Sequence, residues 1–102
     1  MKQKPECKIM ANGSKWWKLD GIVHREDGPA FESADGYRCW FKHGKRHRED
    51  GPAAESKYGA MEWWVNDQRL YPEAMSNNFM KKLKKKYPKL VEAMMVYLVH
   101  ES

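Results

Sequence analysis

The chain has 102 residues, a net charge of +5 and an aromatic content of 13%, which together predict a single domain over residues 1–102 with a modest core. It contains no run of about 18 apolar residues, and this excludes a transmembrane helix. The first five residues lack the apolar stretch of a secretory signal, so we expect a cytoplasmic protein.

A seven-residue string, HREDGPA, occurs twice, at residues 24–30 and again at residues 47–53, an offset of 23 positions. The same offset brings three tryptophans and three glycines into register: Trp17, Trp40, Trp63, Gly13, Gly36 and Gly59. Self-similarity at a fixed period indicates tandem structural repeats. We predict about three copies over residues 7–71, the third of which lacks the heptapeptide and forms a terminal, capping copy.

Each copy has the pattern of a β-hairpin. Asn12-Gly13 and Asp35-Gly36 predict tight turns whose central residues take positive φ. Aromatic-rich strands follow at residues 15–19, 38–42 and 62–65, and such residues favour a pleated, half-buried surface. The predicted fold is therefore α+β: a meander of three tandem β-hairpins, with about six antiparallel strands, followed by one or two C-terminal helices.

Side chains alternate between the two faces of a strand, so Trp17, Trp40 and Trp63 share one face. Stacked hairpins would align these indole rings into a ladder, in which we expect Trp40 to be the most sensitive to truncation. The opposite face carries three aromatic side chains: Trp16, Phe41 and Trp64. They are candidate partner-binding residues, because exposed aromatic patches are typical of protein interfaces, and core packing is the alternative.

The period of 23, the hairpin in each copy and the rhythm of aromatic residues and glycines resemble the MORN repeat family. The HREDGPA string after Trp-rich strands resembles the MORN-like variant of phage, giant-virus and bacterial proteins, some of them antitoxin-like. The resemblance covers residues 7–71 and implies a non-enzymatic protein-binding module. It further implies a small phage-encoded or antitoxin-like protein that binds and inhibits a host or defence protein in the host cytoplasm.

The heptapeptide also holds groups that could carry chemistry, since an imidazole near a carboxylate is a candidate general base or metal ligand. The structural alternative has Asp accepting backbone amides in the turn, Arg pairing with a carboxylate of the adjacent copy, and His donating to a carbonyl. We predict this repeat-structural role, with a partner site as the second reading and no catalytic residue, metal or cofactor. It applies to six side chains: His24, Arg25, Asp27, His47, Arg48 and Asp50.

The two cysteines, Cys7 and Cys39, occupy different positions in the repeat. No repeated framework links them, so we predict two free thiols rather than a disulfide or a structural zinc site.

Residues 72–102 have a helical pattern instead. Apolar residues from Phe79 to Tyr87 recur at spacings of three and four, and Pro88 then ends one helix and begins another. The second helix carries a broad apolar stripe that either packs on the sheet or forms an adaptable interface, a homodimer included. Its candidate partner-binding residues are Met94, Met95 and Leu98.

Most of the positive charge lies in the same segment, where residues 74–102 hold six Lys and two Glu. These lysines are candidate contacts for nucleic-acid phosphates or for an acidic protein partner: Lys81, Lys82, Lys84, Lys85, Lys86 and Lys89. A nucleic-acid-associated protein is therefore the alternative function. We expect no membrane contact, because Lys89 alone flanks the apolar stripe.

Overall fold

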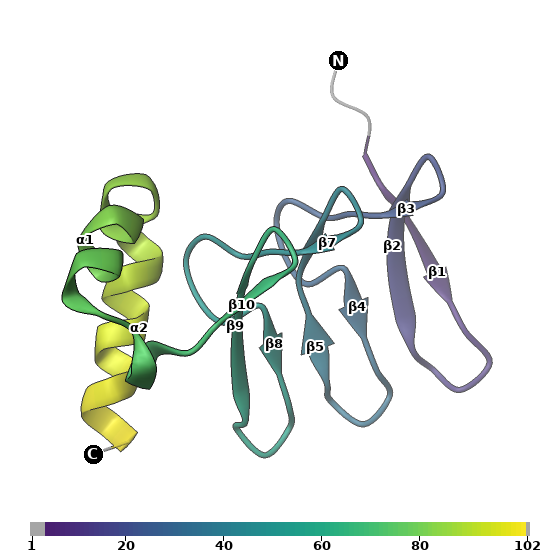
Figure 1. Cartoon of the computed structure of the whole chain (residues 1–102). Helices are drawn as coiled ribbons and strands as arrows, with labels where there is room; N and C mark the ends of the chain where they lie inside the picture. The colour runs from purple at the N-terminus through teal and green to yellow at the C-terminus, as the bar shows by residue number, and fades with distance from the viewer. Residues whose placement is uncertain (1–3, 102) are drawn as a thin grey trace.

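The computed structural model describes residues 4–101, in which an antiparallel sheet is followed by two helices (Figure 1). The strands are β1 (Glu6–Ile9), β2 (Lys15–Leu19), β3 (Ile22–Val23), β4 (Phe31–Glu32), β5 (Arg38–Cys39), β6 (Phe41–Lys42), β7 (Lys45–Arg46), β8 (Ala54–Glu55), β9 (Met61–Val65) and β10 (Gln68–Leu70). A short 3-10 helix, η1 (Pro72–Ala74), precedes α1 (Asn77–Lys86) and α2 (Pro88–Glu101). The predicted α+β meander with C-terminal helices is confirmed.

Eight of the strands form one sheet in the order β1-β2-β4-β5-β8-β9-β10, with β3 paired to β2, while β6 and β7 pair with each other. The described residues contain ten strands rather than about six. Three of the four additional strands arise because the chain turns back after each aromatic-rich strand, which creates a second, short hairpin: β2–β3, β6–β7 and β9–β10. The fourth arises because the predicted strand at residues 38–42 is interrupted at Trp40 and forms β5 and β6. Hairpin turns therefore lie at both ends of the strands (Figure 1).

The two sets of turns differ in backbone geometry. Only the glycine takes positive φ in the turns that precede β2 and β5, with φ of 91° at Gly13 and 97° at Gly36. The sequence prediction of two positive φ angles is therefore wrong there, and each loop is a three-residue turn with a left-handed glycine. Both central residues have positive φ in the short hairpins: Asp20-Gly21, His43-Gly44 and Asn66-Asp67.

The molecule is a thin slab of 43 × 34 × 18 Å, because the helices lie beside the last hairpin instead of covering a face of the sheet (Figure 1). A single layer of strands has little room for a core, and residues as small as Ala30 and Ala53 are fully buried where copies meet. The main apolar core forms at the helical end, from Trp63, Leu70, Tyr87, Leu90 and Met94.

Local sequence features explain where the helices begin. The side chain of Ser76 caps α1 by accepting a hydrogen bond of 3.2 Å from the Phe79 N–H. Pro88 begins α2, in the first turn where its missing N–H removes no helical bond. The predicted break between two helices at Tyr87 is confirmed. This break places the Tyr87 ring edge-on to the His47 ring, with 5.8 Å between the ring centroids.

Candidate functional site

The HREDGPA loops connect each copy to the short hairpin of the next one. The Nδ1 atom of His24 accepts a hydrogen bond of 2.9 Å from the backbone N–H of His43. The equivalent Nδ1 of His47 accepts one of 3.0 Å from the N–H of Asn66. An accepting Nδ1 assigns the proton to Nε2. The prediction that these histidines donate to a carbonyl is therefore wrong: they hold a turn of the following copy.

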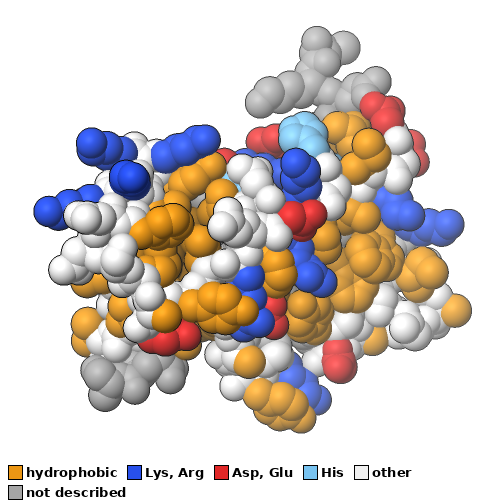
Figure 2. All heavy atoms as spheres, viewed as in Figure 1, with side chains coloured by type: hydrophobic (Ala, Val, Ile, Leu, Met, Phe, Trp, Pro, Cys, Tyr) orange, Lys and Arg blue, Asp and Glu red, His pale blue; other side chains and the backbone are white. Residues whose placement is uncertain are grey.

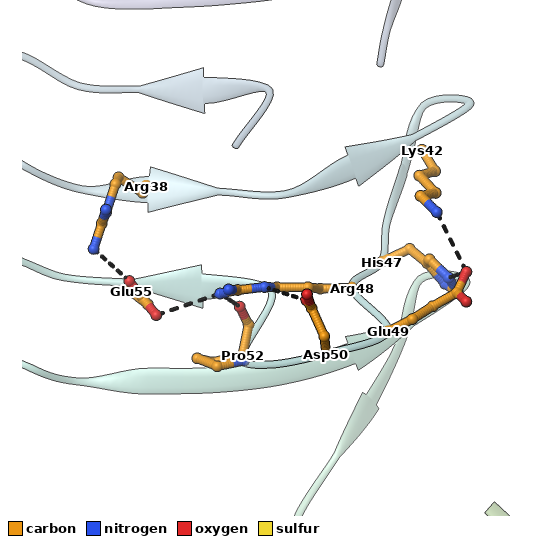
Figure 3. Close-up of polar contacts among 8 residues, drawn as sticks. All are labelled: Arg38, Lys42, His47, Arg48, Glu49, Asp50, Pro52 and Glu55. Atoms are coloured by element: carbon orange, nitrogen blue, oxygen red, sulfur yellow. Dashed lines mark hydrogen bonds and ion pairs between the residues drawn. The ribbon is translucent and has the colours of Figure 1, made fainter. Parts of the chain in front are cut away.

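The Nε2 atom of each histidine faces the glutamate of its own heptapeptide. In the second loop, His47 Nε2 lies 2.9 Å from Glu49 Oε2, and Lys42 Nζ donates to the same oxygen over 3.3 Å (Figure 3). The hydrogen bond from His47, followed by Lys42, lowers the pKa of Glu49. In the first loop, His24 Nε2 lies 3.4 Å from the Glu26 carboxylate.

The guanidinium of each heptapeptide arginine lies over the ring of a tryptophan that precedes it in the same copy. The guanidinium carbon of Arg25 is 4.0 Å from the ring centroid of Trp17, and that of Arg48 is 3.9 Å from Trp40. Such a contact combines apolar burial with cation–π attraction. The predicted structural role therefore consists of a packing contact: the arginine of each heptapeptide covers the indole of its own copy.

Hydrogen bonds within the loop hold each arginine in place. Arg48 donates from Nε to Asp50 over 3.0 Å and from Nη1 to the Pro52 carbonyl over 3.0 Å (Figure 3). Arg25 makes the equivalent bonds within its own loop, including the one to Asp27. The aspartates thus accept from arginine side chains of the same copy, which corrects the predicted bonds to backbone amides. The predicted pairing of an arginine with a carboxylate of the adjacent copy is confirmed for Arg48. Arg48 also reaches Glu55, over 3.4 Å.

The glycine of the heptapeptide is required for space. A Cβ added at Gly28 would lie 2.9 Å from Cζ of Arg25, and one added at Gly51 would lie 2.8 Å from Cζ of Arg48. Neither glycine has positive φ. Any larger residue would push the guanidinium off its indole.

The three aligned indoles do not stack on one another. Equivalent strands are two steps apart in the sheet, which separates their side chains by about 10 Å. In the first two copies an arginine of the same copy lies over the indole ring. In the third copy the Trp63 and Tyr97 ring centroids are 5.5 Å apart. The expected ladder of indoles is therefore wrong, and Trp63, 3% exposed, is the most buried of the three.

The opposite face of the sheet holds the predicted aromatic candidates. Trp16 packs on Phe31 at a centroid distance of 4.2 Å. The guanidinium of Arg46 lies 4.9 Å from Trp64 and 6.0 Å from Phe41. Trp16, Phe41 and Trp64 are all half-buried, so this face offers smaller apolar areas than the sequence suggested.

Burial also changes two groups on that face. It raises the pKa of the Cys39 thiol, and it raises the pKa of the neighbouring Tyr37, to which Cys39 contributes. Both cysteines are free, but Cys7 is exposed whereas Cys39 is buried. Cys7 is therefore the more accessible thiol of the folded chain.

The three candidates on α2 have different environments. Met94 is fully buried in the core, so its prediction as a partner-binding residue is wrong. Leu98 is half-buried, and Met95 is exposed. The pattern places Met95 on a second stripe with Val96 and Val99, which are 51%, 54% and 69% exposed. The sequence analysis missed Val96 because it assigned a single apolar stripe to the second helix. Spacings of three and four residues instead divide the apolar residues into two stripes.

Two hollows flank the helical end. One, of about 600 Å³, lies between α2 and the last hairpin, and its apolar lining includes Met61, Trp63, Val96 and Tyr97. The other, of about 620 Å³, lies where both HREDGPA loops meet the corner between α1 and α2, and its lining is mostly charged. Val96 belongs both to the exposed stripe and to the first hollow, so these two surfaces are continuous.

The six candidate lysines are exposed, and among the side chains of residues 4–100 no ion pair joins any of them to a carboxylate. Figure 2 shows Lys and Arg side chains gathered over the helical end of the molecule, with hydrophobic side chains beside them. The same residues contain no group of three His, Cys, Asp or Glu placed to hold a metal ion. None of their helices has the length and apolar character needed to cross a membrane.

Comparison with known proteins gives no relative: no family model, no curated protein and no solved structure matches the chain. The functional reading therefore rests on the chain's own surfaces.

Proposed function

We propose that this chain is a non-enzymatic protein-binding module. Its contact surface is the exposed stripe of α2 together with the adjoining apolar hollow, a surface that we call the α2 patch. Three apolar residues, Met95, Val96 and Val99, share one exposed helix face, and this observation carries the proposal. Apolar helix faces on small domains are a common basis for docking to another protein.

The contacts of the repeats support a scaffold role. Both buried histidines accept backbone amides, and both arginines bind their own loops. Groups with potential for acid–base chemistry are thus used to join one copy to the next. A rigid array of this kind holds α2 at a fixed position, and a preorganised surface loses less entropy on binding.

The resemblance to MORN-like repeat proteins extends the proposal to a partner class. The chain then acts as a small phage-encoded or antitoxin-like inhibitor in the cytoplasm of the host cell. It occludes a functional surface of a host or defence protein through the α2 patch. The exposed lysines of α1 accelerate the encounter if the partner is acidic, because complementary charge steers association.

The test compares two variants of equal chemical type. Val96→Asp places a charge in the α2 patch, whereas Tyr58→Asp places one at an exposed position of the loop between β8 and β9, outside the lining of the hollow. A protein captured from source cells by the wild type is purified, and its direct binding to each variant is measured by calorimetry. We expect Val96→Asp to lose binding and Tyr58→Asp to keep it. Equal binding of both variants would remove the α2 patch from the proposal.

The partner class has its own readout. The captured protein should lose activity when the wild-type chain is added, and Val96→Asp should restore that activity. A second copy of this chain is another candidate for the α2 patch. Sedimentation of the wild type and of Val96→Asp distinguishes this homodimer from a different partner, since only a homodimer through α2 would dissociate in the variant.

The exposed lysines favour a second function, contact with nucleic-acid phosphates. Each phosphate that a lysine neutralises releases a counterion, so affinity should fall steeply with salt. Lys84→Glu combined with Lys85→Glu should abolish binding to a generic DNA duplex in fluorescence anisotropy. Lys15→Glu combined with Lys45→Glu is the matched control, because both of these lysines are exposed on the sheet. Absence of binding at low salt would dismiss this function.

A further inference from the structure

Within the described residues, the helices cover one end of the sheet and no element covers the other (Figure 1). The helices follow β10 at one end. At the other end β1 pairs with β2, and within the described residues its second edge has no partner strand. All four residues of β1 are exposed. Unpaired strand edges of this kind are where another strand can add to a sheet.

The register of the first hairpin determines which backbone groups face outward. The Met10 N–H donates to the Ser14 carbonyl over 2.8 Å, so the backbone groups of Met10 point toward β2. This direction alternates along a strand, and the N–H and C=O groups of Cys7 and Ile9 therefore point away from β2. Trp17 lies opposite Cys7 and donates its N–H to Ala30, on the side away from β1, as this assignment requires.

We propose that β1 pairs with β1 of a second copy of this chain, antiparallel and about a two-fold axis at Cys7. Cys7 of one copy then exchanges two backbone hydrogen bonds with Cys7 of the other, as residues in a hydrogen-bonded antiparallel pair do. The Ile9 N–H donates to the Pro5 carbonyl of the second copy. Pro5 has no N–H of its own, so the pairing leaves no donor unsatisfied at that position.

The charges of β1 are complementary in this register. Glu6 lies opposite Lys8 of the second copy, and the two-fold axis repeats the pair with the roles exchanged. A shift of two residues in either direction brings Lys8 opposite Lys8, or Glu6 opposite Glu6, and like charges directly opposite are unfavourable. Charge thus selects one register among those that the backbone permits, which is the self-complementarity of an isologous dimer.

The contact is small, because one short strand edge buries less area than a standard protein interface. The proposed dimer is therefore reversible and depends on concentration. The position of Cys7 supplies a chemical probe of it, since opposed Cα atoms in a hydrogen-bonded pair lie about 5.5 Å apart, within the range of a disulfide. The second thiol does not interfere, because Cys39 is buried.

Sedimentation velocity of the full chain under reducing conditions tests the charges. We expect a monomer–dimer equilibrium in the wild type, and a dissociation constant raised roughly tenfold by Glu6→Lys or by Lys8→Glu. The double variant Glu6→Lys with Lys8→Glu restores both pairs with reversed sign and should recover dimerisation. Lys45→Glu, an exposed lysine on β7, is the control for net charge.

Oxidation with diamide is the second measurement. Two Cys7 thiols form one disulfide, and their two hydrogens reduce diamide to the hydrazine. We expect a covalent dimer whose rate of formation falls in Glu6→Lys and recovers in the double variant, and no covalent dimer from Cys7→Ser. The Lys45→Glu variant should form the covalent dimer at the same rate as the wild type.

A chain that stays monomeric at every concentration would overturn the proposal. So would single charge variants that dimerise like the wild type, or a double variant that fails to recover. A dimer that Val96→Asp dissociates while Glu6→Lys does not would place the contact on the α2 patch instead. Loss of partner binding in Val96→Asp with intact dimerisation leaves both proposals standing, so the two can fail independently.

Discussion

The first two copies of the repeat and the third copy solve the same packing problem with different chemistry. Each presents one tryptophan that needs a cover. In the first two copies the cover is the guanidinium of Arg25 or Arg48, and in the third it is Tyr97 of α2. Polar covers permit a thin sheet to continue by repetition, whereas the apolar cover ends the array.

The missing heptapeptide follows from this difference. Leu70 and Tyr71 stand at the positions that His47 and Arg48 occupy in the preceding copy. A histidine there would have no following hairpin to bind, and the buried Leu70 instead joins the helical core. The third copy is thus adapted to a helical neighbour, just as the first two are adapted to another hairpin.

The largest predicted effect tests the apolar end. We expect Trp63→Ala to cost about 3–5 kcal/mol, since it empties the most buried indole position. Trp40→Ala should cost less, because its ring is half-buried under Arg48, although the sequence alone favoured Trp40. Urea unfolding followed by circular dichroism measures both. A greater loss from Trp40→Ala would show that the polar cover, not the helical one, dominates stability.

The next effect tests the histidine contacts. His47→Leu copies the residue of the third copy but leaves the Asn66 amide without its acceptor, at a cost of about 1–3 kcal/mol. Hydrogen exchange should accelerate at the Asn66 amide in particular. His100→Leu, at an exposed position of α2, is the matched control and should leave that amide unchanged. Unchanged exchange in His47→Leu would mean that the turn does not depend on the imidazole.

A smaller effect separates charge from shape in the polar cover. Arg48→Lys keeps the positive charge but loses the guanidinium contact with the Trp40 ring and the paired bonds to Asp50 and Pro52. We expect a loss of about 1 kcal/mol in the free energy of unfolding. Arg69→Lys, at an exposed residue of β10, should lose less. Equal losses of unfolding free energy in Arg48→Lys and Arg69→Lys would indicate that Arg48 stabilises the fold through its charge alone.

The smallest effect concerns pH. Glu49 has a pKa lowered from 4.5, chiefly by the hydrogen bond from His47, so its ionised form is favoured in the folded chain. That stabilisation is present above 4.5 and is lost as pH falls through the lower folded pKa. Thermal unfolding should give the wild type a higher Tm than Glu49→Gln at neutral pH, and the difference in Tm should narrow in acid. The gap is small because the carboxylate is half exposed.

The candidate site was only partly predictable. The sequence placed an interface candidate at Met95, which lies exposed on the second helix. It could not separate Met95 from its neighbour Met94, because their orientation depends on how α2 rotates against Trp63 and Leu90. It also could not assign Trp17 as the partner of Arg25. The contacts of a guanidinium in a loop depend on where the strands lie in the folded sheet.

The sequence by itself determined the repeat period, the aromatic-rich strands and the break between α1 and α2. These features arise from local preferences: positive φ at glycine, pairing of β-forming residues, and the effect of Pro88 on its neighbours. Only the tertiary structure decided that arginines cover the indoles of the first two copies, that the helices cover one end of the sheet, and that no described strand pairs with the outer edge of β1. Those outcomes depend on the distance between strands, which no short stretch of sequence specifies.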